Sequence, residues 1–499
     1  MGERGVSRPQ MQMPTASDGM THHAAEHAYA VMSEEDRHSM LSKHHMKTLW
    51  VYWAIVLAGC WMVLAPLTFS HSVGIVSPSG GRSIWLTDAE RVSYMTWSDI
   101  ISGILLIIFG YRSLVPNRPV SIWICCFVGV WLSIAPLVFW APTAASYIND
   151  TFVGMLVISL SILIPGMPNM IMYMKMGSEV PPGWSYNPSS WPQRWIMIVL
   201  GFFGFVVSRY LAAFQLGYTT SVWDPFFGGS SEHVLNSAMS HALPVSDAAV
   251  GTLAYTFEFL MGFMGSPSRW RTMPWMVAFF GILVIPLGLV HIFLVVSQPV
   301  TVGAWCFFCL LAAGIMLPMI PLEVDEVFAM GQHMVQAKRR GDKFWTVFWK
   351  GGMPFENNKD SRSPELMSLN RQFSKVFSAS VWGMTVPWSL FLSLIIGIAV
   401  VVFPAWAGQP VQSSFSDINH IGGAIVVVVS VISMGKVVRS FRYTNMLAGL
   451  ALALLPWVMT DADMWLKLVN GIAGVAVALL ALPKGPVKEQ YGLWTKHIM

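Results

Sequence analysis

The sequence predicts an all-α, polytopic membrane protein. Of its 499 residues, 54% are hydrophobic and only 11% are charged, whereas soluble globular proteins carry roughly 25% charged residues. Apolar stretches of about 20 residues, the length that crosses a bilayer, recur along the whole chain. The basic residues are scattered through short loops, so the composition predicts no nucleic-acid partner and membrane lipid as the main surroundings.

Twelve apolar stretches are expected to be transmembrane helices. They cover about residues 47–68, 97–114, 119–139, 150–170, 195–214, 247–265, 272–296, 300–321, 380–403, 418–436, 443–459 and 467–483. The chain is therefore expected to contain a central four-helix unit (190–332) between two four-helix repeat pairs (47–172 and 379–485). A polar stretch, 333–378, is expected to be a cytoplasmic linker with a surface helix.

The loop charges predict an orientation. Lys and Arg fall in alternate connections, and the loops that contain neither are 139–149, 215–246, 297–300, 404–417 and 460–466. Because basic loops stay in the cytoplasm, both termini are expected there, in a bacterial cytoplasmic (inner) membrane. Arg82 and Arg91, in the first outer loop, are the exceptions.

The first 46 residues form a polar tail rich in His and Met. The tail lacks the apolar core and cleavage site of a signal peptide, so the first apolar stretch is expected to act as the targeting signal. His and Met suit copper or another soft metal. A tail without Cys and without fixed geometry is more typical of a disordered polar segment, and no metal ligands are assigned.

The chain also contains an internal repeat. The first and third spans share a Trp-x3-Ala-Pro-Leu pattern, and the span after each begins with polar residues that precede a glycine. These elements are Trp61-x3-Ala65-Pro66-Leu67 and Trp131-x3-Ala135-Pro136-Leu137, followed by Asp99 with Gly103 and Asp150 with Gly154. Phe403-Pro404 and Leu455-Pro456 repeat the pattern in the last third. The pattern resembles the SPW repeat family, a two-helix membrane unit in which Pro and Trp end and anchor a span.

Trp305-Cys306-Phe307-Phe308-Cys309 carries the chemistry that the sequence predicts. Two cysteines three positions apart lie near one face of a helix, close enough to bridge if the backbone adjusts. Cys306 is expected in the first two turns of its helix, where the dipole favours a reactive thiolate. The neighbouring rings offer flat apolar surface of the kind a quinone stacks on. The alternative is a pair of inert, buried cysteines.

Four spans with a long outer loop and a C-x-x-C at the outer end of the fourth resemble the vitamin K epoxide reductase family. The resemblance implies that Cys309 faces a quinone (ubiquinone or menaquinone) and that Cys306 exchanges with an incoming thiol. It places Asp247 where the family carries a quinone-binding Asn, although Asp247 also suits a helix cap. Tyr255, Trp305 and Phe308 are expected to contribute to the same quinone site.

The outer loop departs from the family pattern. A second cysteine pair, which would pass electrons to the C-x-x-C, is missing between Gln215 and Val245. Two explanations are open: a separate periplasmic, thioredoxin-like protein reaches Cys306 directly as the thiol partner, or the dithiol relay has been lost and the fold is reused. Ser231, followed by Val234-Leu235, predicts a short amphipathic helix that acts as a lid. Glu232 and His233 are candidates to relay a proton, or simply to cap the helix.

These observations lead to a quinone-linked thiol–disulfide oxidoreductase, with Cys306 and Cys309 as the catalytic pair. Two alternatives remain open. The first is a non-enzymatic scaffold or accessory subunit whose reductase-like core binds lipid or quinone. The second is a metal-handling membrane protein that uses the tail together with Cys306 and Cys309. The missing loop cysteines favour the scaffold, and the intact C-x-x-C favours the enzyme.

Overall fold

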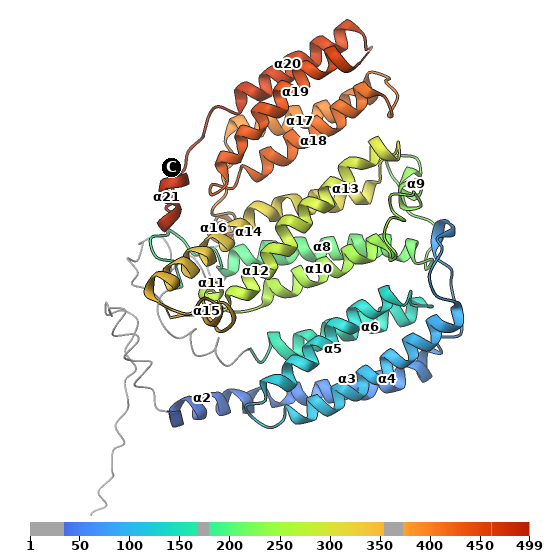
Figure 1. Ribbon diagram of the computed structural model, residues 1–499, viewed down its shortest axis with the longest axis vertical. Helices are drawn as coiled ribbons and strands as arrows, with labels where there is room; N and C mark the ends of the chain where they lie inside the picture. Colours follow the sequence, from blue (N-terminus) through green and yellow to red (C-terminus); the bar gives the residue numbers. More distant parts are fainter. Residues whose placement is uncertain (1–33, 167–178, 354–372, 461, 499) are drawn as a thin grey trace, which may run out of the picture.

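The long helices lie side by side and are stacked largely in the order of the chain (Figure 1). The computed structural model describes residues 34–166, 179–353, 373–460 and 462–498, and all named elements within these ranges are helical, as predicted. The long helices run across the stack. The short helix α9 and the loops around it lie at one end of these helices, and α2, α11, α15 and α21 lie at the other end. We call these the α9 side and the α15 side.

The N-terminal layers follow a polar helix. The elements are α2 (Glu34–Lys47), α3 (Leu49–Phe69), η1 (Ser79–Gly81), α4 (Asp88–Arg112), α5 (Pro119–Val138), α6 (Ala144–Ile158) and η2 (Ser159–Leu163). α3 pairs with α4 and α5 pairs with α6, so each pair is a helical hairpin. Thr87 and Thr143 cap α4 and α6 through backbone N–H groups, which fixes where these helices begin.

The central layers hold the cysteine pair. The elements are α8 (Trp191–Gln215), α9 (Ser230–Leu235), α10 (Asp247–Phe263), α11 (Arg269–Thr272), α12 (Pro274–Ile282), η3 (Leu283–Leu287), α13 (Gly288–Thr301) and α14 (Phe307–Arg340). α12, η3 and α13 form one continuous span with Pro286 inside its wider turn, a usual cause of a local distortion. α14 begins seven residues later than predicted and continues into the expected linker.

The remaining elements are two hairpins that close the stack and short helices, such as α15 on α14 and α16 on α8, that pack on the central layers. The elements are α15 (Phe344–Lys350), α16 (Phe373–Ser380), α17 (Trp388–Trp406), α18 (Ser414–Ile432), η4 (Arg439–Arg442), α19 (Tyr443–Met459), α20 (Met464–Leu480), η5 (Gly492–Trp494) and α21 (Thr495–Ile498). α17 pairs with α18 and α19 with α20. Part of the predicted linker, residues 354–372, lies outside the described residues.

Nine helices of the described chain are long and apolar enough to cross a membrane. A helix overlaps each of the twelve predicted stretches in the sequence, but α10, α19 and α20 have 17 residues each. At 1.5 Å per residue these three are short for a bilayer core. The multi-pass character is therefore confirmed, and the count of twelve stays a prediction.

A glycine pair holds each of the four hairpins together. A Cβ added to Gly59, Gly129, Gly397 or Gly449 would lie 2.5–3.0 Å from the carbonyl oxygen of a glycine on the paired helix. Each of these glycines stands seven residues before a proline, namely Pro66, Pro136, Pro404 or Pro456. Small residues let membrane helices approach closely, so the hairpin geometry repeats wherever this spacing does.

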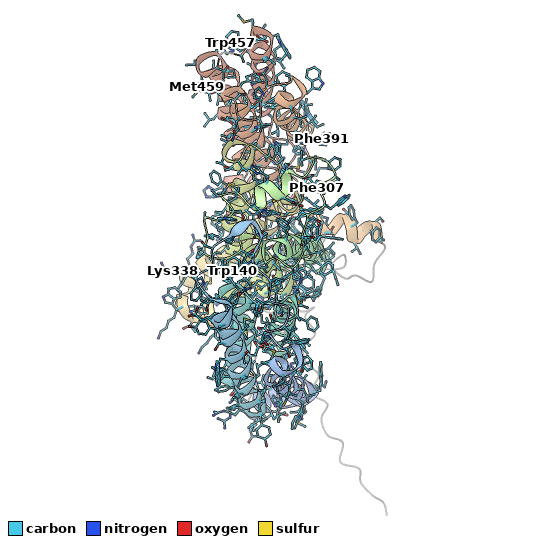
Figure 2. The ribbon with its side chains drawn as sticks, turned by 90° about the vertical axis from the view of Figure 1, so that its right-hand side faces the viewer. Trp140, Phe307, Lys338, Phe391, Trp457 and Met459 are labelled. Atoms are coloured by element: carbon cyan, nitrogen blue, oxygen red, sulfur yellow. A yellow bond between two sulfur atoms is a disulfide. The ribbon has the colours of Figure 1, made fainter. Side chains whose placement is uncertain are left out.

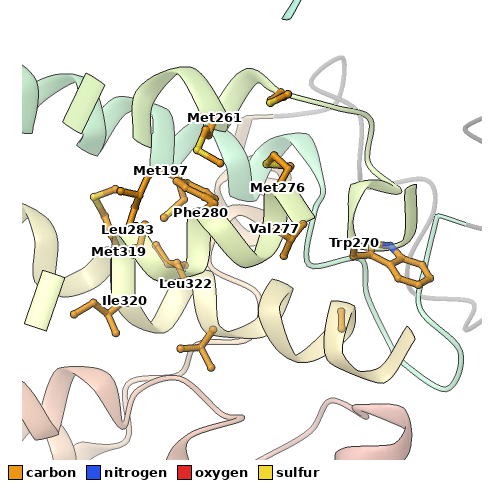
Figure 3. Packing of buried hydrophobic residues seen from close by; sticks show 14 of the residues in the cluster. Met197, Met261, Trp270, Met276, Val277, Phe280, Leu283, Met319, Ile320 and Leu322 are labelled. Atoms are coloured by element: carbon orange, nitrogen blue, oxygen red, sulfur yellow. The ribbon is translucent and has the colours of Figure 1, made fainter. Parts of the chain in front are cut away.

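The core of the central layers is rich in methionine (Figure 3). Met197 of α8, Met261 of α10, Met276 of α12 and Met319 of α14 are buried around Phe280. Unbranched thioether side chains fill irregular gaps between helices. Outward-facing side chains are also apolar, as Phe391, Trp457 and Met459 show (Figure 2), which suits contact with lipid.

Arg82 and Arg91, the two exceptions to the pattern of loop charges, donate hydrogen bonds to backbone carbonyl groups. Arg91 is 1% exposed, and its Nε and Nη2 donate to the carbonyls of Trp140 and Ala141 at 2.7 and 3.3 Å. Arg82 donates to the carbonyl of Val245 at 2.9 Å. Arg82, before α4, and Arg91, in its first turns, therefore tie this part of the chain to later loops on the α9 side.

Candidate redox site at the start of α14

Cys306 and Cys309 form a disulfide with their Cα atoms 5.2 Å apart. Cys306 is the N-cap of α14, with an extended backbone (φ −108°, ψ 119°), and the helix begins at Phe307. The prediction that Cys306 lies inside the helix is therefore wrong. The extended cap brings the two cysteines together, and the Cys309 N–H donates to Cys306 Sγ at 3.2 Å.

The loop between α8 and α10 covers this disulfide. Cys306 has no exposed surface and packs with Val222, Val234 and Leu235 of that loop, whereas Cys309 is half-buried. The predicted short helix exists as α9, although Gly229 and not Ser231 is its N-cap. The apolar residues of α9 face the cysteine pair, which fits the predicted lid.

Three polar side chains fasten the backbone around the cysteines. The Phe307 N–H donates to Ser231 Oγ at 3.1 Å, and Ser230 Oγ donates to the Trp305 carbonyl at 2.6 Å. The Cys306 N–H donates to Gln298 Oε1 at 3.2 Å. Free N–H groups at the start of a helix need such partners. Gln298 lies in the last turn of α13, and nothing in its sequence context indicates a site residue.

Aromatic rings gather on the exposed side of the pair. The Phe308 ring lies 5.0 Å from the Tyr210 ring and 6.3 Å from the Trp223 ring, and the Phe307 ring lies 5.2 Å from that of Phe226. The Trp223 N–H donates to the Tyr210 hydroxyl at 2.9 Å. These edge-on and tilted contacts form an aromatic wall beside the cysteine pair.

Trp305 points toward a different neighbour. Its ring meets the ring of His420, on α18, edge-on at 5.4 Å. A Cβ on Gly303 would lie 2.8 Å from Gln412, just before α18. The structure thus places Trp305 at the contact between the central layers and the third hairpin, and Phe308 on the side of the lid.

Asp247 is the first residue of α10, directly after the N-cap Ser246. Its Oδ1 accepts from Gln215, from Ser240 at 3.0 Å and from the Ala248 N–H at 2.9 Å. Three donors meet on this one oxygen, so the helix-start role that the sequence allowed is present. The neighbouring Ala248 packs against the same apolar cluster as Cys306.

Tyr255 lies deeper, about two turns along α10. It is 1% exposed, and its hydroxyl donates to the Ala312 carbonyl at 2.9 Å, one turn after Cys309 on α14. Its ring fills the space beside Gly204, where a Cβ would come within 2.3 Å. Tyr255 therefore ties α8, α10 and α14 together below the cysteine pair.

Asp224 organises the loop that carries the lid. Its carboxylate accepts the N–H groups of Phe226, Phe227 and Ser231 at 3.3, 2.9 and 3.0 Å. Partial burial raises the pKa of Asp224, but these hydrogen bonds outweigh it, and the net result is a lowered pKa. Glu232, a predicted proton relay, accepts the Val222 N–H at 2.9 Å and so acts as a loop cap.

The described part of the chain contains no group of three or more His, Cys, Asp or Glu residues arranged to hold a metal ion. Most of the His/Met-rich tail, residues 1–33, lies outside the described residues. Within α2, the His44 ring nitrogen lies 2.7 Å from the Pro165 carbonyl, and the His45 ring stacks on Tyr52 at 4.9 Å. These two histidines pack against the first four spans.

Comparison with known families supports this description of the site. Residues 195–324 match the vitamin K epoxide reductase family, and residues 82–164 match the SPW repeat domain. No curated protein and no solved structure gives a significant match to the chain. The first match includes the disulfide, the lid and all the predicted site residues. The chain thus combines a segment that matches the vitamin K epoxide reductase family with one that matches the SPW repeat, and the first match supports a membrane role in thiol–disulfide and quinone chemistry.

Proposed function

We propose that this protein is a membrane thiol–disulfide oxidoreductase that oxidises a periplasmic dithiol and passes its electrons to a quinone. The observation that carries the proposal is the Cys306–Cys309 disulfide at the start of α14. Helix N-termini stabilise a thiolate, and Cys306 Sγ already accepts an N–H from the first turn. A pair of purely structural cysteines would not need this position.

The proposed exchange balances in two steps. A thiolate of the partner attacks Cys306 Sγ, the Cys306–Cys309 bond breaks, and Cys309 leaves as a thiolate. The second thiol of the partner then displaces Cys306, so the partner departs as a disulfide and the protein is left as a dithiol. Reforming the disulfide releases two electrons and two protons, which a bound quinone would accept. Because Cys306 is fully buried, the lid must move before the partner can attack.

The residues around Cys309 fit a quinone ring. Phe308, Tyr210 and Trp223 provide aromatic surface beside the half-buried sulfur. Asp247, with Gln215 and Ser240, supplies a polar group at the neighbouring start of α10. These residues would hold the ring and its carbonyls, while Trp305 and Tyr255 would fix the helices around it. Ubiquinone and menaquinone both meet this description.

The test counts thiols in the purified, full-length protein. After reduction and removal of the reductant, a short-chain ubiquinone or menaquinone analogue is added, and free thiols are alkylated under denaturing conditions. Cys60, Cys125 and Cys126 are free in the structure, so they provide an internal count of three. We expect five labelled cysteines before quinone and three after it.

Matched variants make the result specific. Cys309→Ser should keep four labelled cysteines whether or not quinone is present, whereas Cys60→Ala should still lose two on oxidation. A membrane-impermeant alkylating reagent on intact cells then tests whether the pair faces the periplasm, as loop charges predict. If Cys306 and Cys309 stay reduced with either quinone while the protein remains folded, the enzyme proposal is wrong.

Two observations favour the scaffold alternative. The lid seals Cys306, and the covering loop has no cysteine to receive electrons. A reductase-like core that only binds quinone or lipid would show quinone binding without any change in the number of labelled thiols. The same thiol count therefore separates the two functions.

A further inference from the structure

A second buried cluster lies on the α9 side of the first two hairpins, apart from the disulfide. His71 follows α3, Asp99 lies in the middle of α4, and Asp150 lies in the second turn of α6. They are 2%, 0% and 0% exposed. The His71 Nε2 is 2.9 Å from Asp99 Oδ2, and the carboxyl groups of Asp99 and Asp150 are within hydrogen-bonding reach of each other.

Two oxygens in this cluster have no donor. Asn149 donates to Asp150 Oδ1 at 3.1 Å, and His71 satisfies Asp99 Oδ2, but Asp99 Oδ1 and Asp150 Oδ2 lack a partner. Two carboxylates that meet away from water repel each other unless a proton lies between them. We propose that Asp99 and Asp150 form a proton-binding site in the membrane, which holds one shared proton and exchanges it by way of His71, the residue in contact with Asp99.

The two hairpins build this site by a reciprocal exchange of hydrogen bonds. The indole of Trp61, on the first hairpin, donates to Asn149 on the second at 2.8 Å. The indole of Trp131, on the second hairpin, donates to Ser98 on the first at 3.0 Å. Asn149 and Ser98 each precede one of the two aspartates. The aspartates therefore meet where the two hairpins face each other.

The last two hairpins provide a neutral counterpart within the same chain. Asp99 and Asp150 each stand four residues before the glycine of their hairpin crossing, Gly103 and Gly154. At the same spacing from Gly423 and Gly474, the chain carries Asn419 and Asn470, which are 0% and 1% exposed. Asn fills the position without titrating, so packing alone does not require the acid.

Other titratable groups surround the pair. Tyr147 lies one turn before Asp150, and Arg209 of α8 lies over the Tyr147 ring at 5.1 Å and donates to Thr151 at 3.2 Å. Tyr218 is also close enough to interact electrostatically with Asp150, Tyr147 and Arg91. Burial lowers the pKa of His71, which the charge of Asp150 partly opposes. His71 Nδ1 has no partner and is the place for a second proton at lower pH.

The site is tested by infrared spectroscopy on the purified, full-length protein. A shared carboxyl proton gives a C=O stretching band of a protonated acid, which shifts as deuterium replaces hydrogen. We expect this band at neutral pH in the wild type and its loss in Asp150→Asn, because the new amide can donate to an ionised Asp99. His71→Gln should keep the band but slow its exchange in D2O.

The controls separate this site from other buried acids and from misfolding. Asp463→Asn changes an exposed residue before α20 and should leave the band unchanged. The double variant Asp99→Asn/Asp150→Asn copies the pair in the last hairpins, so it keeps the test valid if a single variant fails to fold. Identical protonated-acid bands in the wild type and the folded double variant would show that the pair carries no proton. This proposal does not depend on the redox function.

Discussion

At the scale of single residues, the glycine pair in the first hairpin leaves no room for a side chain. A Cβ on Gly103 would lie 2.6 Å from the Gly59 carbonyl oxygen and 2.8 Å from the Val63 N. Neither backbone atom can move aside cheaply. We therefore expect Gly103→Ala to reduce stability by about 1–3 kcal/mol, the usual cost of overpacking, and to lower the unfolding temperature of the detergent-solubilised protein.

Gly471→Ala is the matched control, because a Cβ there meets nothing within 4 Å. Alanine favours a helix over glycine, so this change should leave the unfolding temperature unchanged or raise it slightly. If both variants unfold at the same temperature as the wild type, the close approach of α3 and α4 is not what holds the hairpin.

At the scale of elements, the loop that carries α9 is expected to respond to pH through Asp224. The pKa of Asp224 is lowered in the folded loop, so its contribution to stability is complete above the unfolded value of about 3.9. That contribution is lost as the pH falls through the lowered folded value. A phosphine reductant, which acts in acid, should therefore reduce the Cys306–Cys309 disulfide about threefold faster once the loop hydrogen bonds weaken.

Asp224→Asn removes the charge while keeping the size of the side chain. This variant should show faster disulfide reduction already at neutral pH and little further acceleration in acid. Ser237→Ala serves as the control, since Ser237 bonds only within its own loop, to the Val234 carbonyl and the Ser240 N–H. If the rate of disulfide reduction depends on pH in the same way in the wild type and in Asp224→Asn, Asp224 does not hold the lid.

The same element shows where sequence reasoning stops. Composition, span length and the C-x-x-C spacing were enough to predict the helical fold, the disulfide neighbourhood and a short helix over it. They missed the extended backbone of Cys306 and the hydrogen bond from its N–H to Gln298, because both depend on how α13 ends. They also missed Tyr210, whose role depends on α8 and α14 lying side by side.

At the scale of the whole molecule, the repeats can be recognised in the sequence, but the contact between the first two hairpins cannot. The Pro and Gly positions in each hairpin predicted four similar units. Nothing local indicated that Asp99 and Asp150 would face each other, since 50 intervening positions separate them and only the stacking of hairpins joins them. Likewise, the two outer-loop arginines broke the charge pattern for a reason found only in their backbone partners.

The C-terminal segment returns from the last hairpin to the central layers and closes the molecule. Tyr491 has no exposed surface, and its ring lies 5.1 Å from that of Trp184 and 6.0 Å from that of Tyr186. The Ser185 N–H donates to the Gln490 carbonyl at 3.1 Å. A large buried aromatic replaced by alanine loses both packing and a filled space. Tyr491→Ala should therefore destabilise the protein by about 3–5 kcal/mol.

Two measurements, the unfolding temperature and the sensitivity to a protease, would show where the Tyr491→Ala protein loses stability. If the segment ties the last two hairpins to the central layers, Tyr491→Ala should lower the unfolding temperature and also expose residues 179–190 to a protease. His497→Ala, at an exposed position six residues further on, should change neither quantity. A Tyr491→Ala protein with unchanged unfolding and unchanged proteolysis would mean that other contacts, such as those of α13 and α14 with α18, hold the central layers and the last hairpins together.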